Sequence, residues 1–212
     1  MRTEPGLRER KKRQTRRHIA DTALALFTAQ GFERVTVAEI ARTAEVSEAT
    51  VFNYFRTKED LIYDGMAAYE QALVAALRER PPDQSLLTAF REFLLASHGR
   101  LADLAPADLD RIADIARLIT ASPALQARER QLIDDCARAV AELLVEQTGA
   151  APEDVTPWAV AHALVGTHRA LVHHAWARIL DGQGGAAVAE RIREQADRAL
   201  GLLGDGLARY PG

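Results

Sequence analysis

The chain has 212 residues and a net charge of −3, with 48% hydrophobic and 27% charged residues. This composition provides material for one large or two smaller cores and excludes an intrinsically disordered chain. The single cysteine, Cys136, excludes a disulfide within the chain and any cysteine-based zinc motif. No apolar run approaches the ~18 residues of a membrane span, and the N-terminus lacks a signal-peptide pattern. We therefore expect a soluble, cytoplasmic protein that does not enter a membrane.

Charge is distributed unevenly along the chain. Residues 1–58 contain 12 Lys or Arg and 7 Asp or Glu, a net charge of +5, whereas residues 59–212 carry a net charge of −8. Eight of the basic residues fall within residues 1–17. A basic run of this kind is often only a solvated tail, but it is also typical of an arm that binds phosphates.

The first predicted helix covers residues 7–30. Its apolar side chains recur at helical spacing and form one inward stripe, Ile19, Ala20, Ala23, Leu26 and Phe27. Gly31 follows directly and is expected to end the helix as its C-cap.

Two short helices follow, joined by a tight turn. Thr36 is expected to be the N-cap of the first, with Glu39 three residues later in the capping-box position. The turn is Glu45–Val46, and Ser47 is expected to cap the second helix, residues 48–55.

The second of these helices has two different faces. Val51 and Phe55 would be buried, and the outward side chains would be Glu48, Ala49, Thr50, Asn53 and Tyr54. A helix-turn-helix places its second helix in the major groove of DNA, with the early residues near the base edges. Beside such a motif, the basic run is better interpreted as a phosphate-binding arm.

The segment 36–58, TVAEIARTAEVSEATVFNYFRTK, resembles the DNA-binding region of the TetR family of bacterial transcription regulators. The matching positions are Thr36, Ile40, Ala41, Ala44, Val46, Ser47, Thr50, Tyr54, Phe55, Lys58 and Leu61. Glu45 stands where the family usually has glycine, which predicts a non-glycine residue in the left-handed region at a cost of roughly 1 kcal/mol. Ala49 and Phe52 also depart from the family, at positions where glycine and tyrosine are common.

The resemblance implies a role for each outward side chain. Glu48, Ala49 and Asn53 would face base edges, where Asn suits adenine and Glu suits the cytosine amino group. Thr50, Tyr54 and Lys58 would contact phosphates, as would the backbone amides at Thr36, where a helix N-terminus favours anions. Arg13, Arg16 and Arg17 would touch the DNA backbone or the minor groove. Ser47, the cap of the second helix, completes the set of DNA-binding candidates.

The rest of the chain has helical patterns and no period-two strand pattern. Thr57 is expected to cap a helix that runs to about residue 80, and further helices are expected at about residues 83–101, 106–120, 123–147, 153–180 and 186–208. We therefore predict an all-α fold of about nine helices. Residues 1–58 would form a three-helix DNA-binding domain with its basic arm, and residues 59–212 a helical regulatory and dimerisation domain.

In the TetR family the middle helices of the body commonly hold a small-molecule pocket. Apolar walls with a few polar groups would suit a small hydrophobic or amphipathic effector. The candidate residues are Phe90, Phe93, His98, Arg117, Thr120 and Cys136. The simpler alternative is that these side chains only fill the core, where Cys136 would act as a small hydrophobic residue.

In the family the last two helices of each subunit form a four-helix dimer interface. The candidates for that interface here are His162, Gly166, Arg169, His173, Trp176, Gly201 and Gly204. Glycine weakens a helix, so a packing role that allows close helix approach is a plausible reason for its presence. The four histidines between residues 162 and 174 leave a metal site as an alternative, although no carboxylate joins them.

No Ser/His/Asp constellation and no HExxH, Walker or GxSxG pattern indicates an enzyme, and no cofactor is expected. The expected function is that of a homodimeric regulator of transcription. In its simplest form it would be a repressor that a small molecule releases from a near-palindromic double-stranded DNA operator. Two alternatives stay open: a DNA-binding protein of the same type without a ligand, acting as an architectural or partner-regulated factor, or a metal- or haem-responsive helical sensor.

Overall fold

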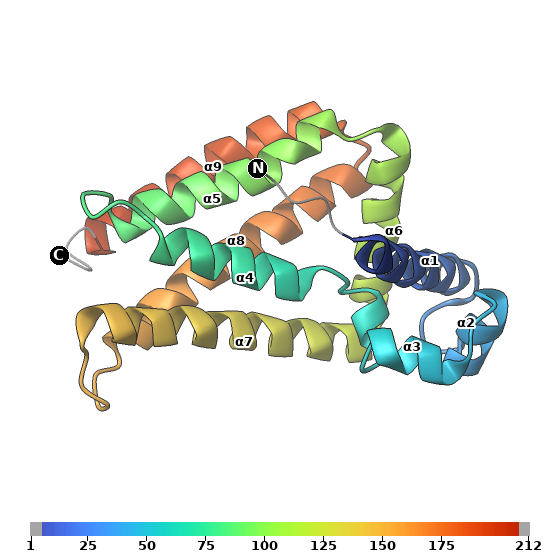
Figure 1. The fold of residues 1–212 in the computed structure, drawn as a ribbon. Helices are drawn as coiled ribbons and strands as arrows, with labels where there is room; N and C mark the ends of the chain where they lie inside the picture. Colours follow the sequence, from blue (N-terminus) through green and yellow to red (C-terminus); the bar gives the residue numbers. More distant parts are fainter. Residues whose placement is uncertain (1–5, 208–212) are drawn as a thin grey trace. The chain divides into compact units, whose positions relative to one another are not determined.

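The computed structural model describes residues 6–207, which fold into helices connected by short loops (Figure 1). In this part of the chain there are nine α-helices and two 3₁₀ turns, so the all-α prediction is confirmed. The helices are α1 (Leu7–Gln30), α2 (Val37–Thr43), α3 (Glu48–Tyr54), α4 (Met66–Arg78), α5 (Leu86–Gly99), α6 (Pro106–Ala121), α7 (Pro123–Thr148), α8 (Thr156–Leu180) and α9 (Gly185–Leu207). Among residues 6–207, no helix is both long and apolar enough to cross a bilayer.

The chain divides into two compact units. The head unit comprises residues 1–65 and 114–128, and the body unit comprises residues 66–113 and 129–212. Helices α6 and α7 therefore each contribute residues to both units. The functional boundary at residue 58 stays a prediction, because compactness does not show where DNA binding ends.

The head unit is built around the inward stripe of α1. Phe27 is fully buried and packs against Phe32, with 4.9 Å between the ring centroids. Gly31 has φ +87°, and its N–H donates to the carbonyl oxygen of Phe27 at 2.8 Å, so the helix ends where the sequence predicted. The same core receives the buried side chains Ile19, Ala23, Ile40, Val51 and Phe55.

The predicted helix after residue 57 is wrong in its first turns. Thr57 and Asp60 do cap each other: the Thr57 N–H donates to Asp60 Oδ2 at 3.1 Å, and the Asp60 N–H donates to Thr57 Oγ1 at 3.3 Å. This cap starts only a 3₁₀ turn, Glu59–Leu61. Gly65 then adopts φ +98°, which a right-handed helix cannot continue through, and α4 begins one residue later.

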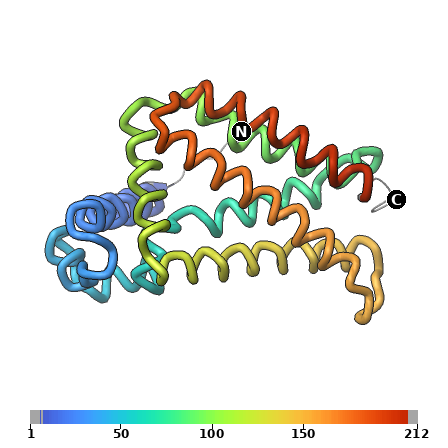
Figure 2. Tube along the Cα trace, turned by 180° about the vertical axis from the view of Figure 1, so that it is seen from behind, coloured from blue at the N-terminus to red at the C-terminus, as the bar shows by residue number. Residues whose placement is uncertain are grey.

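The body unit packs its helices around a single apolar core. Helices α5 and α9 lie side by side, and α8 packs against α9 (Figures 1 and 2). The fully or almost fully buried residues of this core include Leu77, Phe90, Leu144, Leu164 and Ile192. At the start of α9, a Cβ on Gly185 would overlap the carbonyl oxygen of Leu101, so glycine is required for this close approach.

Candidate nucleic-acid interface

Helix α3 is fixed at its start and along one face. Ser47 Oγ accepts a hydrogen bond from the Thr50 N–H at 3.0 Å, as the sequence predicted. Val51 and Phe55 are each 1% exposed and hold the helix on the head core. A helix this short is unstable in isolation, so that buried face keeps it in place. The exposed side chains on its other face include Glu48, Ala49 and Asn53, whereas Thr50 and Tyr54 are half-buried.

Helix α2 and the turn after it also follow local sequence signals. Thr36 Oγ1 accepts a hydrogen bond from the Glu39 N–H at 3.2 Å. The Glu39 carboxylate accepts a bond from Gln30 Nε2 at 3.0 Å, which ties α2 to the end of α1. Glu45 has φ +55°, so the predicted left-handed residue is present in the turn.

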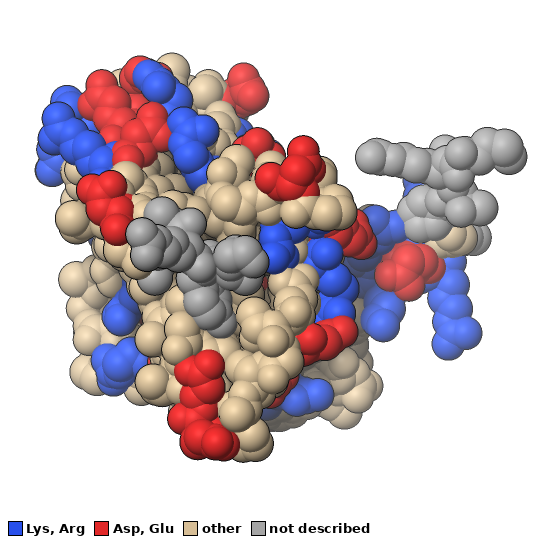
Figure 3. All heavy atoms as spheres, turned by 90° about the vertical axis from the view of Figure 1, so that its left-hand side faces the viewer, with Lys and Arg blue, Asp and Glu red and all other residues tan. Residues whose placement is uncertain are grey.

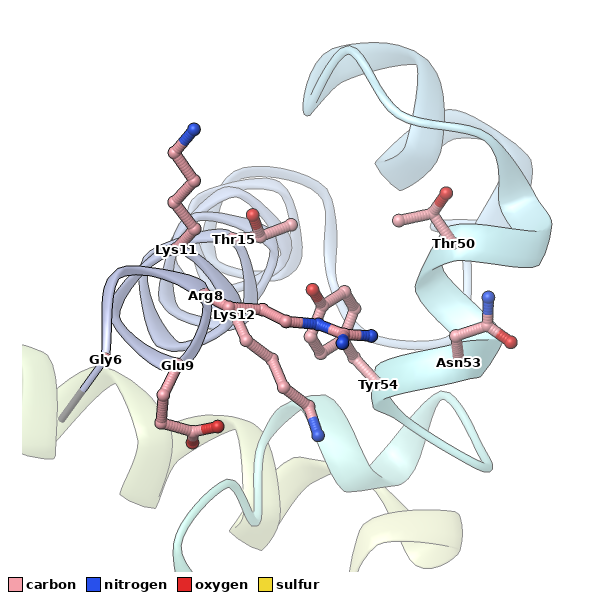
Figure 4. A pocket seen from close by; sticks show the side chains of 9 residues that line it. All are labelled: Gly6, Arg8, Glu9, Lys11, Lys12, Thr15, Thr50, Asn53 and Tyr54. Carbon is pink, nitrogen blue, oxygen red and sulfur yellow. The ribbon is translucent and has the colours of Figure 1, made fainter.

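A groove of about 840 Å³ lies between the start of α1 and helix α3 (Figure 4). In Figure 4 the cationic side chains of Arg8, Lys11 and Lys12 fan out from α1, opposite Thr50 and Asn53 of α3. The remaining lining residues are Gly6, Glu9, Thr15 and Tyr54. Three cations and one carboxylate give the groove a net positive charge, which suits a phosphate backbone.

Arg16, predicted to contact phosphate, is bound within the head unit. Its Nε donates to Asp64 Oδ1 at 2.7 Å, and its Nη1 donates to the carbonyl oxygen of Tyr54 at 2.7 Å. Its guanidinium also lies 4.5 Å from the ring centroid of Phe55. A cation at this place satisfies the C-terminal end of α3, so Arg16 positions α3.

The other arginines predicted for the arm, Arg13 and Arg17, are exposed on α1. Neither is among the residues that line the groove. That they touch the DNA backbone or the minor groove stays a prediction, and composition alone does not show which helical face packs beside α3. The spacing of Arg8, Lys12 and Thr15 along one face of α1 was the available signal.

Lys58 was also predicted to contact phosphate, and its ammonium has two partners in the head unit. Nζ donates to the carbonyl oxygens of Phe32 at 2.9 Å and Val35 at 3.2 Å. It lies 4.2 Å from the ring centroid of Phe32 as well. These contacts hold the loop between α1 and α2.

The six ligand-binding candidates fall in different units. Arg117 and Thr120 belong to the head unit, where both are exposed. Arg117 pairs with Asp114 at 2.8 Å, and Thr120 Oγ1 donates to a carbonyl of its own helix. The other four candidates belong to the body unit: Phe90, Phe93, His98 and Cys136.

Two further residues contact Phe93 and His98. They are Tyr69, which no sequence pattern assigned to a site, and His168, one of the four histidines of the alternative metal site. The rings of Tyr69 and His168 stack with 4.6 Å between centroids and 17° between planes. The ring of Phe93 lies 5.3 Å from that of Tyr69, and the ring of His98 lies 5.4 Å from that of His168. The available signal was a histidine at helical spacing among the apolar residues of α8. We call Tyr69, Phe93, His98 and His168 the aromatic cluster.

Burial keeps the titratable groups of this region uncharged. It lowers the pKa of His168 to about 3, with His98 adding to the effect, and it lowers the pKa of His98 as well. Burial raises the pKa of the Tyr69 hydroxyl and raises that of the Cys136 thiol to about 12. All four groups are therefore neutral near pH 7.

The dimer candidates differ in exposure. His162, Gly166 and Gly201 are exposed, and a Cβ on either glycine would meet no atom within 4 Å. Gly204 faces its own chain instead, since a Cβ there would lie 3.3 Å from Leu87 on α5.

The remaining dimer candidates interact with α7 of the same chain or with each other. Arg169 and His173 donate to the carboxylate of Glu129 at 3.3 and 2.8 Å, and Trp176 stacks on His173 with 5.0 Å between centroids. Across the described part of the chain, no group of three or more His, Cys, Asp or Glu side chains is arranged to hold a metal ion.

Comparison with known proteins agrees with this geometry. Residues 19–63 match the family model for bacterial regulatory proteins of the tetR family, and residues 84–198 match the MftR C-terminal domain. The HTH-type transcriptional regulator TcmR of Streptomyces glaucescens is 34% identical over 152 residues, which cover 71% of this chain and 67% of TcmR. The chain belongs to the TetR family. A putative mycofactocin biosynthesis transcriptional regulator, MftR of Mycobacterium tuberculosis, is 27% identical over 169 residues, covering 80% of this chain and 83% of MftR.

Solved TetR structures share the fold. NalD, a secondary repressor of the MexAB-OprM efflux pump in Pseudomonas aeruginosa, superposes with a TM-score of 0.56 at 19% identity, covering 88% of this chain and 97% of NalD. A putative TetR-family regulator from Syntrophomonas wolfei gives a TM-score of 0.58 at 18% identity, covering 90% of this chain and 97% of that protein. Proteins of the TetR family are DNA-binding regulators of transcription and not enzymes, so this protein is a transcriptional regulator.

Proposed function

We propose that this TetR-family regulator is a homodimeric repressor that binds a near-palindromic operator and leaves it when a small molecule binds the body. The observation that carries the proposal is the exposed face of α3 beside the positively charged groove. A helix in the major groove reads bases, and a neighbouring basic groove holds the backbone in register. Such a protein would act in the cytoplasm, on the chromosome.

The division of labour at the interface follows from side-chain chemistry. Asn53 and Glu48 have the amide and carboxylate that pair with adenine and with the cytosine amino group in the major groove. Arg8, Lys11 and Lys12 supply the charge that neutralises phosphates. We propose that Arg16 and Lys58 act indirectly, by holding α3 and the α1–α2 loop in place.

A single helix the length of α3 reads too few base pairs for a unique site, so two copies are needed. The outward faces of α8 and α9 are suited to join them. Large apolar side chains are exposed there: Trp158 is 39%, Leu180 40% and Leu202 77% exposed. A Cβ on Gly166 of α8 or on Gly201 of α9 would meet no atom within 4 Å, so both positions leave room for a second chain. In the dimer the two α3 helices would enter successive major grooves about 34 Å apart.

Release would follow from a shift in population. A ligand that binds the body better in one conformation moves the dimer toward that conformation, and DNA that prefers another conformation is released. The coupling is reciprocal, so operator DNA would weaken ligand binding by the same factor.

The first test is selection of bound sequences from random double-stranded DNA, followed by footprinting of the selected site. The proposal expects two inverted half-sites about one helical turn apart and one dimer per site. Sedimentation of the protein with and without Gly166→Glu then tests the interface, and the expected result is a dimer that becomes a monomer. Gly206→Glu, at an exposed glycine near the end of α9, is the control. Selection of a single asymmetric half-site, or a monomeric wild-type protein, would refute the dimeric proposal.

A further inference from the structure

The aromatic cluster contains two buried polar atoms that have no partner among the described residues. They are the hydroxyl of Tyr69 and Nδ1 of His168. His168 is only 9% exposed and is held in a stack with Tyr69. Buried polar atoms are nearly always hydrogen-bonded in folded proteins, because a buried donor or acceptor without a hydrogen bond is unfavourable. Two such atoms on stacked rings indicate a place where another molecule supplies the partners.

His98 adds a third polar atom with a defined role. Its Nδ1 lies 3.0 Å from the carbonyl oxygen of Leu94, which can only accept. Nδ1 therefore carries the proton, and in the neutral ring Nε2 is an acceptor. The cluster thus combines a hydroxyl that can donate with imidazole nitrogens, one of which must accept.

A cleft of about 260 Å³ reaches the cluster at His98. It lies between the end of α5 and the start of α9, and small residues line much of it: Gly99, Ala102, Ala186 and Ala189. Two of the other lining residues, Glu190 and Arg193, are charged, and they are paired with each other at 3.0 Å. The volume is slightly below the ~300–1,000 Å³ of most ligand pockets, so only a small molecule would fit.

The charge state of the cluster limits what can bind. Tyr69, His98 and His168 are all uncharged near pH 7 because they are buried. A charged ligand would lose its hydration without gaining an opposite charge from these three groups. Flat aromatic side chains also favour a flat partner that stacks against them.

We propose that this cluster is the effector site and that it binds a small, flat, uncharged aromatic molecule with a ring hydroxyl. The aromatic plane would stack within the cluster, the ligand hydroxyl would donate to a histidine nitrogen, and the Tyr69 hydroxyl would donate to the ligand oxygen. This proposal rests on ligand release as proposed above and specifies the chemistry of its ligand.

Equilibrium dialysis of the full-length protein against three fluorescent probes tests the ligand class. 2-Naphthol has the ring and the hydroxyl, naphthalene has only the ring, and 2-naphthoate adds a charge. We expect 2-naphthol to bind roughly a hundredfold more tightly than naphthalene, about tenfold for each of the two proposed hydrogen bonds, and 2-naphthoate to bind more weakly than either. Equal binding of all three probes, or tightest binding of 2-naphthoate, would overturn the proposal.

The substitution Tyr69→Phe tests whether the Tyr69 hydroxyl binds the ligand. Two measured quantities should change in opposite directions: the melting temperature and the affinity for 2-naphthol. Without ligand, the variant loses an unsatisfied buried hydroxyl, so its melting temperature should rise by about 2–4 °C. Its affinity for 2-naphthol should fall roughly tenfold while its affinity for naphthalene is kept. The matched control is Tyr63→Phe, because the Tyr63 hydroxyl already donates to the carbonyl oxygen of Leu125 at 2.8 Å. That control should lower the melting temperature and leave 2-naphthol binding unchanged.

A Tyr69→Phe protein that melts lower and binds 2-naphthol as the wild type does would show a purely structural tyrosine and reject the site. Operator release is measured separately, by gel shift with 2-naphthol. If 2-naphthol binds through Tyr69 but the operator stays bound, the site stands and ligand-driven release fails. If another compound releases the operator and Tyr69→Phe does not alter its affinity, release stands and this site fails.

Discussion

Lys58 holds the loop between α1 and α2 through Phe32, because its ammonium donates to the carbonyl oxygen of that residue and also lies over its ring. A charged hydrogen bond and a cation–π contact together stabilise a partly desolvated site by about 2 kcal/mol. We therefore expect Lys58→Met to lower the free energy of unfolding of the head unit by about that amount, measured by urea denaturation.

The control for this prediction is Lys11→Met, which removes an exposed lysine from α1. It should change stability by less than about 0.5 kcal/mol and weaken DNA binding. If Lys58→Met unfolds at the wild-type urea concentration yet binds every DNA sequence more weakly, the ammonium is a phosphate ligand after all, as the family resemblance implied.

The groove between α1 and α3 is expected to contribute to the salt dependence of DNA binding. Lys12 lines that groove, and each phosphate contact contributes about 0.9 to the slope of log K against log salt concentration. Lys12→Ala removes one contact from each protomer, so the slope for a dimer should become less steep by about 1.8. Fluorescence anisotropy of a labelled operator across a salt series measures it.

Arg191→Ala is the matched loss of charge in the body unit, where Arg191 is exposed and paired with Glu194 at 3.0 Å. For Arg191→Ala, the slope of log K against log salt concentration should equal that of the wild type. Acidic and basic side chains are interspersed on the face of the molecule in Figure 3, which is unlike a surface for a nucleic-acid backbone. A reduced slope for Arg191→Ala as well would mean that DNA also contacts the body.

Local signals in the sequence predicted the head unit closely. Thr36 and Ser47 cap α2 and α3 as expected, because a cap depends on residues only three positions apart. The break at Gly65 was missed, since a glycine inside a helical pattern is compatible with either outcome. The fate of Arg16 was missed for a different reason: its partner Asp64 is 48 residues away, and no periodicity in the sequence connects them.

For the ligand-binding candidates of the body unit, burial was predicted from the sequence but contacts between distant residues were not. Phe90 and Cys136 were expected to be apolar and buried, and they are. The stack of Tyr69 on His168 joins α4 to α8, and helix packing alone brings the two residues together. A polar site of this kind is assembled from several helices, so each helix by itself shows only a single unusual residue.

Base readout by α3 is tested with Asn53→Ala. Asn53 is exposed on α3 and lines the groove, where its amide can pair with adenine. The variant should lose about 1–3 kcal/mol of discrimination at a single operator position and retain its preference elsewhere. Competition binding with a set of single-base operator variants measures this. Equal losses on the cognate and a scrambled operator would show that Asn53 contacts only the backbone.

The turn of the helix-turn-helix stores strain at Glu45, whose φ of +55° favours glycine. Glu45→Gly should stabilise the protein by about 1 kcal/mol, which raises the melting temperature by roughly 2–4 °C. Glu45→Ala keeps the Cβ that causes the strain and should give no such gain, so it is the control. Both variants should bind the operator with wild-type affinity, and a gain shared by both would instead implicate the loss of the carboxylate.

The burial of His168 makes the free energy of unfolding decrease as the pH falls. Burial lowers the pKa of His168 to about 3 from the usual 6.5, so between these values the unfolded chain binds a proton that the folded chain does not. This contribution to stability is therefore fully present above pH 6.5 and is lost as the pH falls toward 3, at up to about 1.4 kcal/mol per pH unit. The lowered pKa of His98 acts with the same sign.

His168→Phe keeps a flat ring for Tyr69 to stack on and removes the titration. Urea midpoints measured between pH 7 and 4.5 should fall less steeply for this variant than for the wild type. Protonation of paired carboxylates such as Glu146, whose pKa is lowered by Arg78, continues in both proteins and cancels in the comparison. Identical slopes for wild type and His168→Phe would mean that His168 takes up its proton in the folded protein as readily as in the unfolded chain.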